Sequence, residues 1–248
     1  MQFTAHSDGP STRARRFQHD GVDGVLWTPL QTTPQSPAPL VFAGQPGGAA
    51  GLEASMPRLE QRASAAASAG LATFTLELPG AGARPPLPGV DQARRELHGE
   101  FAAGRKPRGD LVDRLILPLV DQAVPETLGA LDALLELPEL KGPVGYSGGV
   151  IAIAVRALTR DPRFAAAILF AGSLIPERTM EEARALEIPV TMLLQWDDTG
   201  NDRERSLALF DAFAAGEKTL IANMGGHLGV PAGAGAQARQ FLASHLQP

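Results

Sequence analysis

Residues 140–155, which read LKGPVGYSGGVIAIAV, constrain the fold more than any other part of the chain. The centre of this stretch is a G-x-S-x-G pentapeptide that runs from Gly145 to Gly149, with Ser147 in the middle. A short apolar run precedes the pentapeptide, and residues 150–155 follow it as an apolar segment without Pro or Gly. This order is typical of a buried strand, a very sharp turn and a buried helix.

A turn of this kind would hold Ser147 in a strained conformation and lift its hydroxyl clear of the sheet. Side chains at Gly145 and Gly149 would collide across the turn, which explains the glycines at these positions. The following helix, expected to begin at Gly148, would direct backbone N–H groups and the positive end of its dipole at the serine. The pattern therefore predicts a nucleophilic Ser147, and the alternative is a structural serine in a glycine-rich turn.

Composition excludes several kinds of function. The chain has 248 residues and no cysteine, which rules out disulfides, thiolate nucleophiles and Cys-ligated metals. Its net charge of -5 at pH 7 gives no basic surface for nucleic acid. No apolar run approaches the ~18 residues of a membrane span, and the N-terminal residues lack the apolar segment of a secretory signal. We therefore expect a cytoplasmic protein without a nucleic-acid or membrane partner.

Short apolar runs alternate with helical patterns along most of the chain. Residues 13–18 and 25–30 flank a glycine-containing turn and predict an antiparallel hairpin. Further strands are expected over residues 40–43, 71–76, 164–170, 190–194 and 219–222, and helices over residues 52–69, 91–103, 111–137, 179–186, 203–214 and 234–246. The alternation predicts an α/β fold with a doubly wound, mostly parallel sheet in one domain, residues 1–248.

The segment over residues 81–110 is rich in Gly, Pro and Arg and is expected to cover the pocket. Its six Arg and Lys side chains could receive a substrate carboxylate or form a solvated helix face. The helix over residues 111–137 is expected to be interrupted or kinked at Pro118 and Pro125. Residues 171–188 contain only one short helical pattern, so we expect little or no cap between the later strands.

Polar residues follow two further strands at their carboxyl ends, where ligands bind in a sheet of this type. Asp197 and Asp198 come soon after the strand over residues 190–194, and His227 follows the strand over residues 219–222. The order along the chain is serine, acid, histidine. A serine needs a base that accepts its proton, and the base needs an acid that fixes its tautomer and stabilises the imidazolium. These residues predict a catalytic triad in which either aspartate could be the acid.

The motifs and their order resemble the α/β-hydrolases, in particular small bacterial dienelactone-hydrolase-like serine esterases, over nearly the whole chain. The resemblance implies the α/β-hydrolase fold, with Ser147 as nucleophile, His227 as base and Asp198 as the acid of the triad. Residues 76–82, LELPGAG, resemble the family's D-x-P-G-x-G turn, with Glu77 in place of its aspartate.

The chain departs from this family in the oxyanion loop, which usually reads His-Gly and here reads QPGG over residues 45–48. Pro46 has no N–H, so the resemblance leaves the backbone of Gly47 and Gly148 as oxyanion donors, assisted by the amide of Gln45. One such donor contributes about 2.7–4 kcal/mol to the transition state. A poorly formed oxyanion hole would give a weak hydrolase or a fold used for other chemistry.

Two aromatic residues flank the expected triad. Trp196 precedes the aspartates and could line the acyl pocket or pack under the loop, and Tyr146 precedes the serine, where packing and substrate contact are both open.

No spacing of His and carboxylates predicts a metal site, and no Gly-rich loop predicts a cofactor. We expect hydrolysis of a small ester, lactone or thioester through an acyl-enzyme. The alternatives are non-hydrolytic chemistry, such as cyclisation, dehydration or acyl transfer, and a silent binding protein on the same scaffold.

Overall fold

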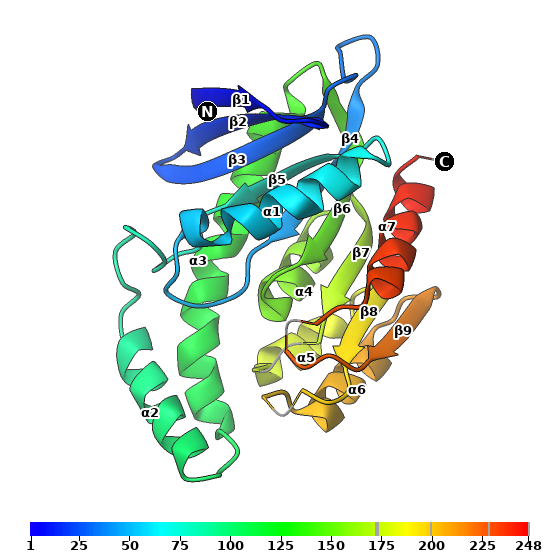
Figure 1. Ribbon diagram of the computed structural model, residues 1–248. Helices are drawn as coiled ribbons and strands as arrows, with labels where there is room; N and C mark the ends of the chain where they lie inside the picture. The colour runs from blue at the N-terminus through cyan, green and yellow to red at the C-terminus, as the bar shows by residue number, and fades with distance from the viewer. Residues whose placement is uncertain (172–173, 199, 228, 248) are drawn as a thin grey trace.

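The computed structural model describes residues 1–171, 174–198, 200–227 and 229–247. These residues form a nine-stranded sheet with the order β1-β2-β3-β5-β4-β6-β7-β8-β9 (Figure 1). The strands are β1 (Gln2–Asp8), β2 (Thr12–His19), β3 (Val22–Pro29), β4 (Ala38–Gly44), β5 (Ala72–Leu76), β6 (Leu140–Gly148), β7 (Phe164–Phe170), β8 (Val190–Gln195) and β9 (Lys218–Asn223). The helices are α1 (Leu52–Ala67), α2 (Val90–Ala102), α3 (Gly109–Leu135), α4 (Ile151–Arg160), α5 (Glu177–Ala183), α6 (Arg203–Ala212) and α7 (Ala232–Leu246).

The strand directions agree with the predicted mixed sheet. β3 pairs antiparallel with both β2 and β5, and the strands from β5 to β9 in the sheet order pair parallel with one another. β1 adds a third antiparallel strand to the predicted hairpin. All seven β1 residues are exposed, so this edge strand has no apolar alternation by which the sequence could indicate it. The predicted α/β-hydrolase fold, with its N-terminal antiparallel strands, is confirmed.

The sheet separates two apolar layers (Figure 1). On one face Val41 and Ile168 pack against α7 through Leu242 and Leu246, and α1 covers the same face farther toward β3. On the other face the helices α3 to α6 bury the largest cluster of apolar side chains. Alternating strand residues therefore contribute to opposite layers, and the ends of the parallel strands are held rigidly between them.

Helix α3 continues through both of its prolines, so of the two predicted alternatives, an interruption or a kink, the interruption is excluded. Each proline removes one helix hydrogen bond and costs roughly 3 kcal/mol. Ten residues of α3 are buried, and most of them belong to the large apolar cluster over the sheet. Burial of a single large apolar side chain contributes about 1.5–3 kcal/mol, so packing outweighs the cost of Pro118 and Pro125.

The connections between the later strands are short. Between β7 and β8 the described residues form one helix, α5, in agreement with the predicted small cap. The N-cap of this helix is Pro176, and Thr179 is buried inside the helix. Helix α6 is capped by Asp202, which accepts a hydrogen bond from the backbone N–H of Arg205. No helix within the described ranges has the length and apolar character needed to cross a membrane.

Candidate active site

The turn that follows Ser147 is formed by two left-handed glycines. Gly148 has φ +70° and Gly149 has φ +80°, whereas Ser147 is not in the left-handed region, and α4 begins only at Ile151. The expectations of a strained serine and of a helix that begins at Gly148 are therefore wrong. Glycine adopts positive φ at little cost, so the two glycines make the bend and Ser147 keeps the extended backbone of β6.

The glycines around Ser147 are required by close packing with other segments. A Cβ at Gly149 would lie 2.7 Å from the Cα of Gly44, at the end of the neighbouring strand β4. A Cβ at Gly145 would lie 2.8 Å from Cδ1 of Leu246, on α7. The expected collision across the turn is therefore replaced by two separate contacts, one with β4 and one with α7.

Asp198 and His227 form a hydrogen-bonded pair between the loops that follow β8 and β9. Asp198 Oδ2 lies 2.7 Å from His227 Nδ1, and the other oxygen, Oδ1, accepts the N–H of Gly200 at 2.9 Å. The side chain of Asp198 is 5% exposed and that of His227 is 61% exposed. A buried carboxylate on Nδ1 orients the ring and leaves Nε2 directed away from the acid.

The neighbouring Asp197 has a different role in the same loop. Its carboxylate accepts the backbone N–H groups of Gly225 and Gly226, which precede the histidine, at distances of 2.9–3.1 Å. The hydrogen bond from Gly226, followed by that from Gly225, holds the pKa of Asp197 below its usual range. Asp198 therefore contacts the histidine ring, and Asp197 anchors the backbone of its loop.

Ser147 is bonded to an arginine and not to the histidine. Nη2 of Arg62, on α1, donates to the hydroxyl of Ser147 at 3.2 Å and to its backbone carbonyl at 2.6 Å. Neither residue of the Asp198–His227 pair shares a hydrogen bond with Ser147 in the described part of the chain. Of the predicted triad, the structure thus pairs the acid with the histidine and holds the serine separately.

Sequence reasoning did not identify Arg62. Its Nη1 also donates to the carbonyl of Gly44 at 3.0 Å, so the guanidinium joins the ends of β4 and β6. Burial, together with the smaller effect of the nearby charge of Arg58, lowers the pKa of Arg62 to about 10. No motif marks an arginine 85 residues before the serine, and only the packing of α1 on the sheet brings the two together.

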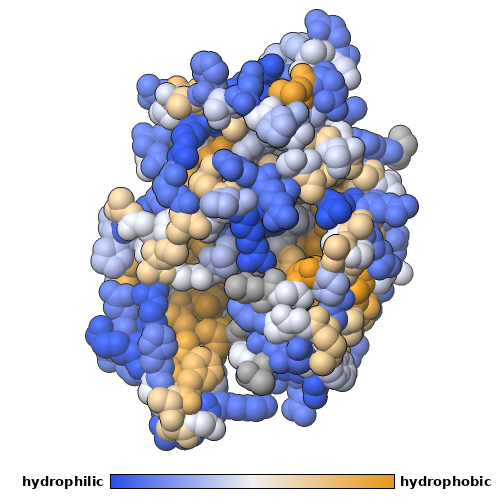
Figure 2. All heavy atoms as spheres, in the orientation of Figure 1, coloured by the Kyte–Doolittle hydropathy of each residue, from blue (hydrophilic) through white to orange (hydrophobic). Residues whose placement is uncertain are grey.

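A cavity of about 570 Å³ opens at this edge of the sheet. Gly47, Arg62 and His227 lie in its lining, and so does His98 of α2. The apolar part of the lining comprises Leu59, Leu87, Val90, Leu97, Leu115, Ile116, Leu119, Ile151, Phe170 and Leu174. Figure 2 shows a hollowed apolar area over α3, beside α2. Helices α2 and α3 thus supply an apolar wall opposite the polar residues.

The three expected substrate-binding residues lie outside this lining, as do Ser147, Gly148 and Asp198. Gln45 is buried and its amide donates to the carbonyl of Leu76. Tyr146 is fully buried, with its ring 5.1 Å from that of Phe42, and burial raises its pKa. Trp196 is 45% exposed and stacks under the guanidinium of Arg203. The burial of Gln45 and Tyr146 indicates packing roles, and Tyr146 faces the layer opposite to Ser147 because side chains alternate across a strand.

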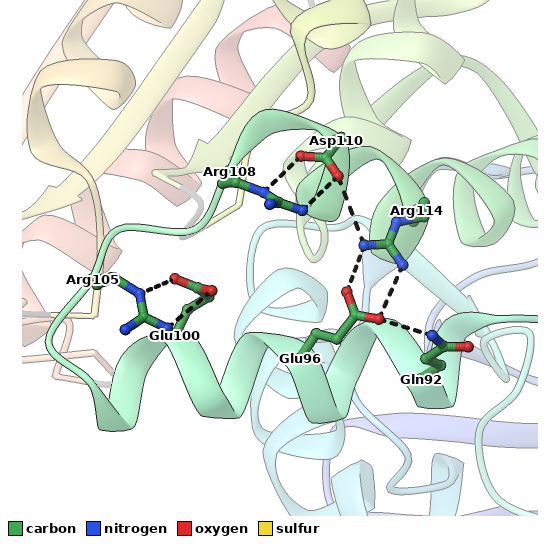
Figure 3. Close-up of polar contacts among 7 residues, drawn as sticks. All are labelled: Gln92, Glu96, Glu100, Arg105, Arg108, Asp110 and Arg114. Carbon is green, nitrogen blue, oxygen red and sulfur yellow. Dashed lines mark hydrogen bonds and ion pairs between the residues drawn. The ribbon is translucent and has the colours of Figure 1, made fainter.

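An exposed ion pair between Glu96 and Arg114 bridges α2 and α3 (Figure 3). Glu96 accepts from Arg114 at 2.6 Å and from Gln92 at 3.0 Å. The remaining pairs in this network are Glu100 with Arg105, at 2.7 Å, and Asp110 with Arg108, at 3.1 Å. Of the basic residues in the 81–110 segment, Arg105 and Arg108 thus bind acids at the surface, as expected of a solvated helix face, whereas Arg94 lies in the cavity lining. In the described part of the chain, no three His, Asp or Glu side chains are grouped so that they could hold a metal.

Comparison with solved structures identifies the architecture. No protein-family model and no curated protein sequence matches the chain. A cold-adapted esterase from an Arctic intertidal metagenomic library, in its PEG-bound complex, superposes with a TM-score of 0.76 at 25% identity, covering 100% of both chains. An acetyl xylan esterase from Paenibacillus sp. R4 gives a TM-score of 0.66 at 17% identity, covering 99% of this chain and 88% of the other.

A third solved structure comes from a protein described as dienelactone hydrolase-like, the group that the sequence motifs resemble. A dienelactone hydrolase-like promiscuous phosphotriesterase from metagenomic libraries gives a TM-score of 0.59 at 19% identity, covering 94% of this chain and 97% of the other. The chain therefore has an α/β-hydrolase fold similar to that of these solved structures.

Proposed function

We propose that this chain is a serine hydrolase that cleaves a small ester, lactone or thioester through an acyl-enzyme. Ser147 is the nucleophile, His227 the general base and Asp198 the acid that orients the base. The observation that carries the proposal is the 2.7 Å pair of Asp198 and His227, with the histidine in the lining of the cavity. An acid bonded to Nδ1 leaves Nε2 free to accept the proton of a serine.

The reaction would begin with attack of the Ser147 hydroxyl on the carbonyl carbon of the substrate. The hydroxyl proton passes to His227, the bond from Oγ to carbon forms, and the carbonyl oxygen takes the electron pair. The N–H groups of Gly47 and Gly148 are the oxyanion donors in this proposal. Hydrogen bonds between catalytic groups are often long without substrate, so the separation of Ser147 and His227 is compatible with this role.

The cavity and the structural relatives support a small ester as substrate. A volume of about 570 Å³ is within the range of small-molecule sites. The apolar wall from α2 and α3 suits an acyl group, and the polar side carries His227. Because the cold-adapted esterase shares the fold over the full length of both chains, ester hydrolysis is the reaction that we infer.

Turnover of p-nitrophenyl esters with acyl chains of increasing length tests the proposal. We expect hydrolysis of the shorter esters, and loss of turnover in Ser147→Ala and His227→Ala to the level of the uncatalysed reaction or a small residual rate. The control variant is Ser244→Ala, which changes an exposed serine on α7 far from the cavity lining. Retention of activity in Ser147→Ala would refute the assignment of the nucleophile.

A second candidate is non-hydrolytic acyl chemistry on the same residues. Two observations favour it: Pro46 supplies no N–H to the oxyanion loop, and the amide of Gln45 is used by Leu76. Under this alternative Ser147 is acylated, but a nucleophile other than water releases the product. Reaction in water labelled with oxygen-18 separates the two, because hydrolysis places the label in the released acid and acyl transfer does not.

A further inference from the structure

We propose that Arg62 is a further catalytic residue, whose guanidinium stabilises the negative charge that develops on the Ser147 oxygen as its proton passes to His227. The inference rests on the proposed function and assigns a residue that the triad does not include. It is motivated by the direct contact, at 3.2 Å, between Nη2 of Arg62 and Oγ of Ser147.

The direction of this hydrogen bond is determined by chemistry. A guanidinium has five N–H donors and no acceptor, so the Ser147 oxygen must be the acceptor. The hydrogen of the hydroxyl is then free for donation to a base. A serine in this arrangement can release its proton to His227 while Arg62 keeps its contact with the oxygen that becomes negative.

The geometry holds Arg62 in place. Its Nη1 and Nη2 donate to the carbonyls of Gly44, at 3.0 Å, and of Ser147, at 2.6 Å. A Cβ at Gly148 would lie 3.0 Å from Nη2, so a glycine at this position leaves room for the guanidinium. Donors fixed by the fold before the reaction need no rearrangement as charge develops, which is the basis of electrostatic catalysis.

The positive charge of Arg62 is not neutralised. In the described ranges its hydrogen-bond acceptors are two carbonyls and one hydroxyl, and no ion pair joins it to an acid. With a pKa of about 10 it stays protonated at neutral pH. An opposite charge within about 4–6 Å lowers the pKa of an acid by 1–3 units, which favours the serine alkoxide.

The test is the second-order rate of fluorophosphonate labelling, with kcat and KM for a short p-nitrophenyl ester, in Arg62→Gln and Arg62→Lys. The matched control is Arg160→Gln, which removes the same charge at an exposed site at the end of α4, outside the cavity lining. We expect labelling and kcat to fall roughly 10²–10³-fold in Arg62→Gln, with KM little changed and Arg62→Lys intermediate. In Arg62→Ala, added guanidinium ion should restore part of the labelling rate, at concentrations well below those that unfold the protein.

Labelling of Arg62→Gln at the parent rate would overturn the inference and leave the proposed function standing. A loss that matches the unfolded fraction in circular dichroism, without rescue by guanidinium, would also overturn it, because Arg62 would then have only a structural role. Absence of labelling in the parent protein would instead refute the proposed function itself. In the parent protein, the labelling rate should decline as the pH rises above about 10, where Arg62 loses its proton. The labelling rate of Arg62→Gln should lack this decline.

Discussion

Asp198 Oδ2 lies 2.7 Å from Nδ1 of His227, although the two residues come from loops that follow different strands, β8 and β9. If this contact orients the catalytic base, Asp198→Asn should lower kcat by on the order of 10⁴-fold, because the amide favours the wrong tautomer of the histidine. The measurement is turnover of a short p-nitrophenyl ester at pH 7. A larger loss in Asp197→Asn than in Asp198→Asn would contradict the assignment.

The contacts of Asp197 predict a different effect on the same loop. Asp197→Ala removes the acceptor of the Gly225 and Gly226 N–H groups, so the histidine loop loses its anchor. We expect kcat to fall about 10- to 100-fold through misplacement of the base. Asp197→Asn, which keeps one acceptor oxygen, should lose less, and an equal loss in both variants would argue for a role of the charge.

The lowered pKa of Asp197 also predicts a pH dependence. Because the folded state lowers this pKa, the contribution of the carboxylate is fully present above its ordinary value near 4 and is lost as the pH falls through the lowered value. Hydrogen exchange at the amides of Gly225 and Gly226 should therefore remain slow from neutral pH down to about 4 and lose its protection below that. Protection that is lost well above pH 4 would contradict this account.

The close approach of the turn to β4 predicts a large cost for a side chain at Gly149. In Gly149→Ala the Cβ would meet Gly44 at 2.7 Å, and the backbone would hold alanine at a φ of +80°. We expect a loss of about 2–5 kcal/mol in the free energy of unfolding, from left-handed strain and overpacking. Gly99→Ala, in α2 with no atom near its Cβ, should instead gain roughly 0.5–1 kcal/mol. Urea unfolding measures both values.

Apolar packing rather than ion pairing should hold α2 in place. Leu97 is buried against Leu111 and Leu115, so Leu97→Ala should lower the free energy of unfolding by about 2–5 kcal/mol and raise KM by opening the cavity wall. Glu96→Gln removes the ion pair with Arg114 shown in Figure 3, which is exposed, and should leave the urea midpoint nearly unchanged. A marked effect of Glu96→Gln would show that the surface network orders this helix.

The sequence predicted the architecture because the parallel strands are buried on both faces. β7 occupies the predicted residues, since a continuous apolar run bounded by polar residues has few other structures. The exposed strand β1 and the two prolines inside α3 were not predictable, because backbone pairing and tertiary packing decide them. The loops that carry Asp198 and His227 were identified from their position after strands, which is a general property of such sheets.

The backbone conformation at Ser147 could not be predicted from the sequence. The pentapeptide predicted a turn at the serine, but Gly148 follows directly and can adopt positive φ, so the bend moves one residue along the chain. The resulting orientation of the hydroxyl toward Arg62 depends on the placement of α1 on the sheet. Such a contact between distant segments leaves no periodic pattern or local motif in the sequence.

The central claim is that Ser147 is an activated nucleophile. The most direct measurement is fluorophosphonate labelling of the purified protein, followed by mass spectrometry of the labelled peptide, with Ser147→Ala and His227→Ala as controls. The account predicts one adduct, on Ser147, that is absent from Ser147→Ala and forms far more slowly in His227→Ala. An adduct on another residue, or none at concentrations that label an active serine esterase, would contradict it.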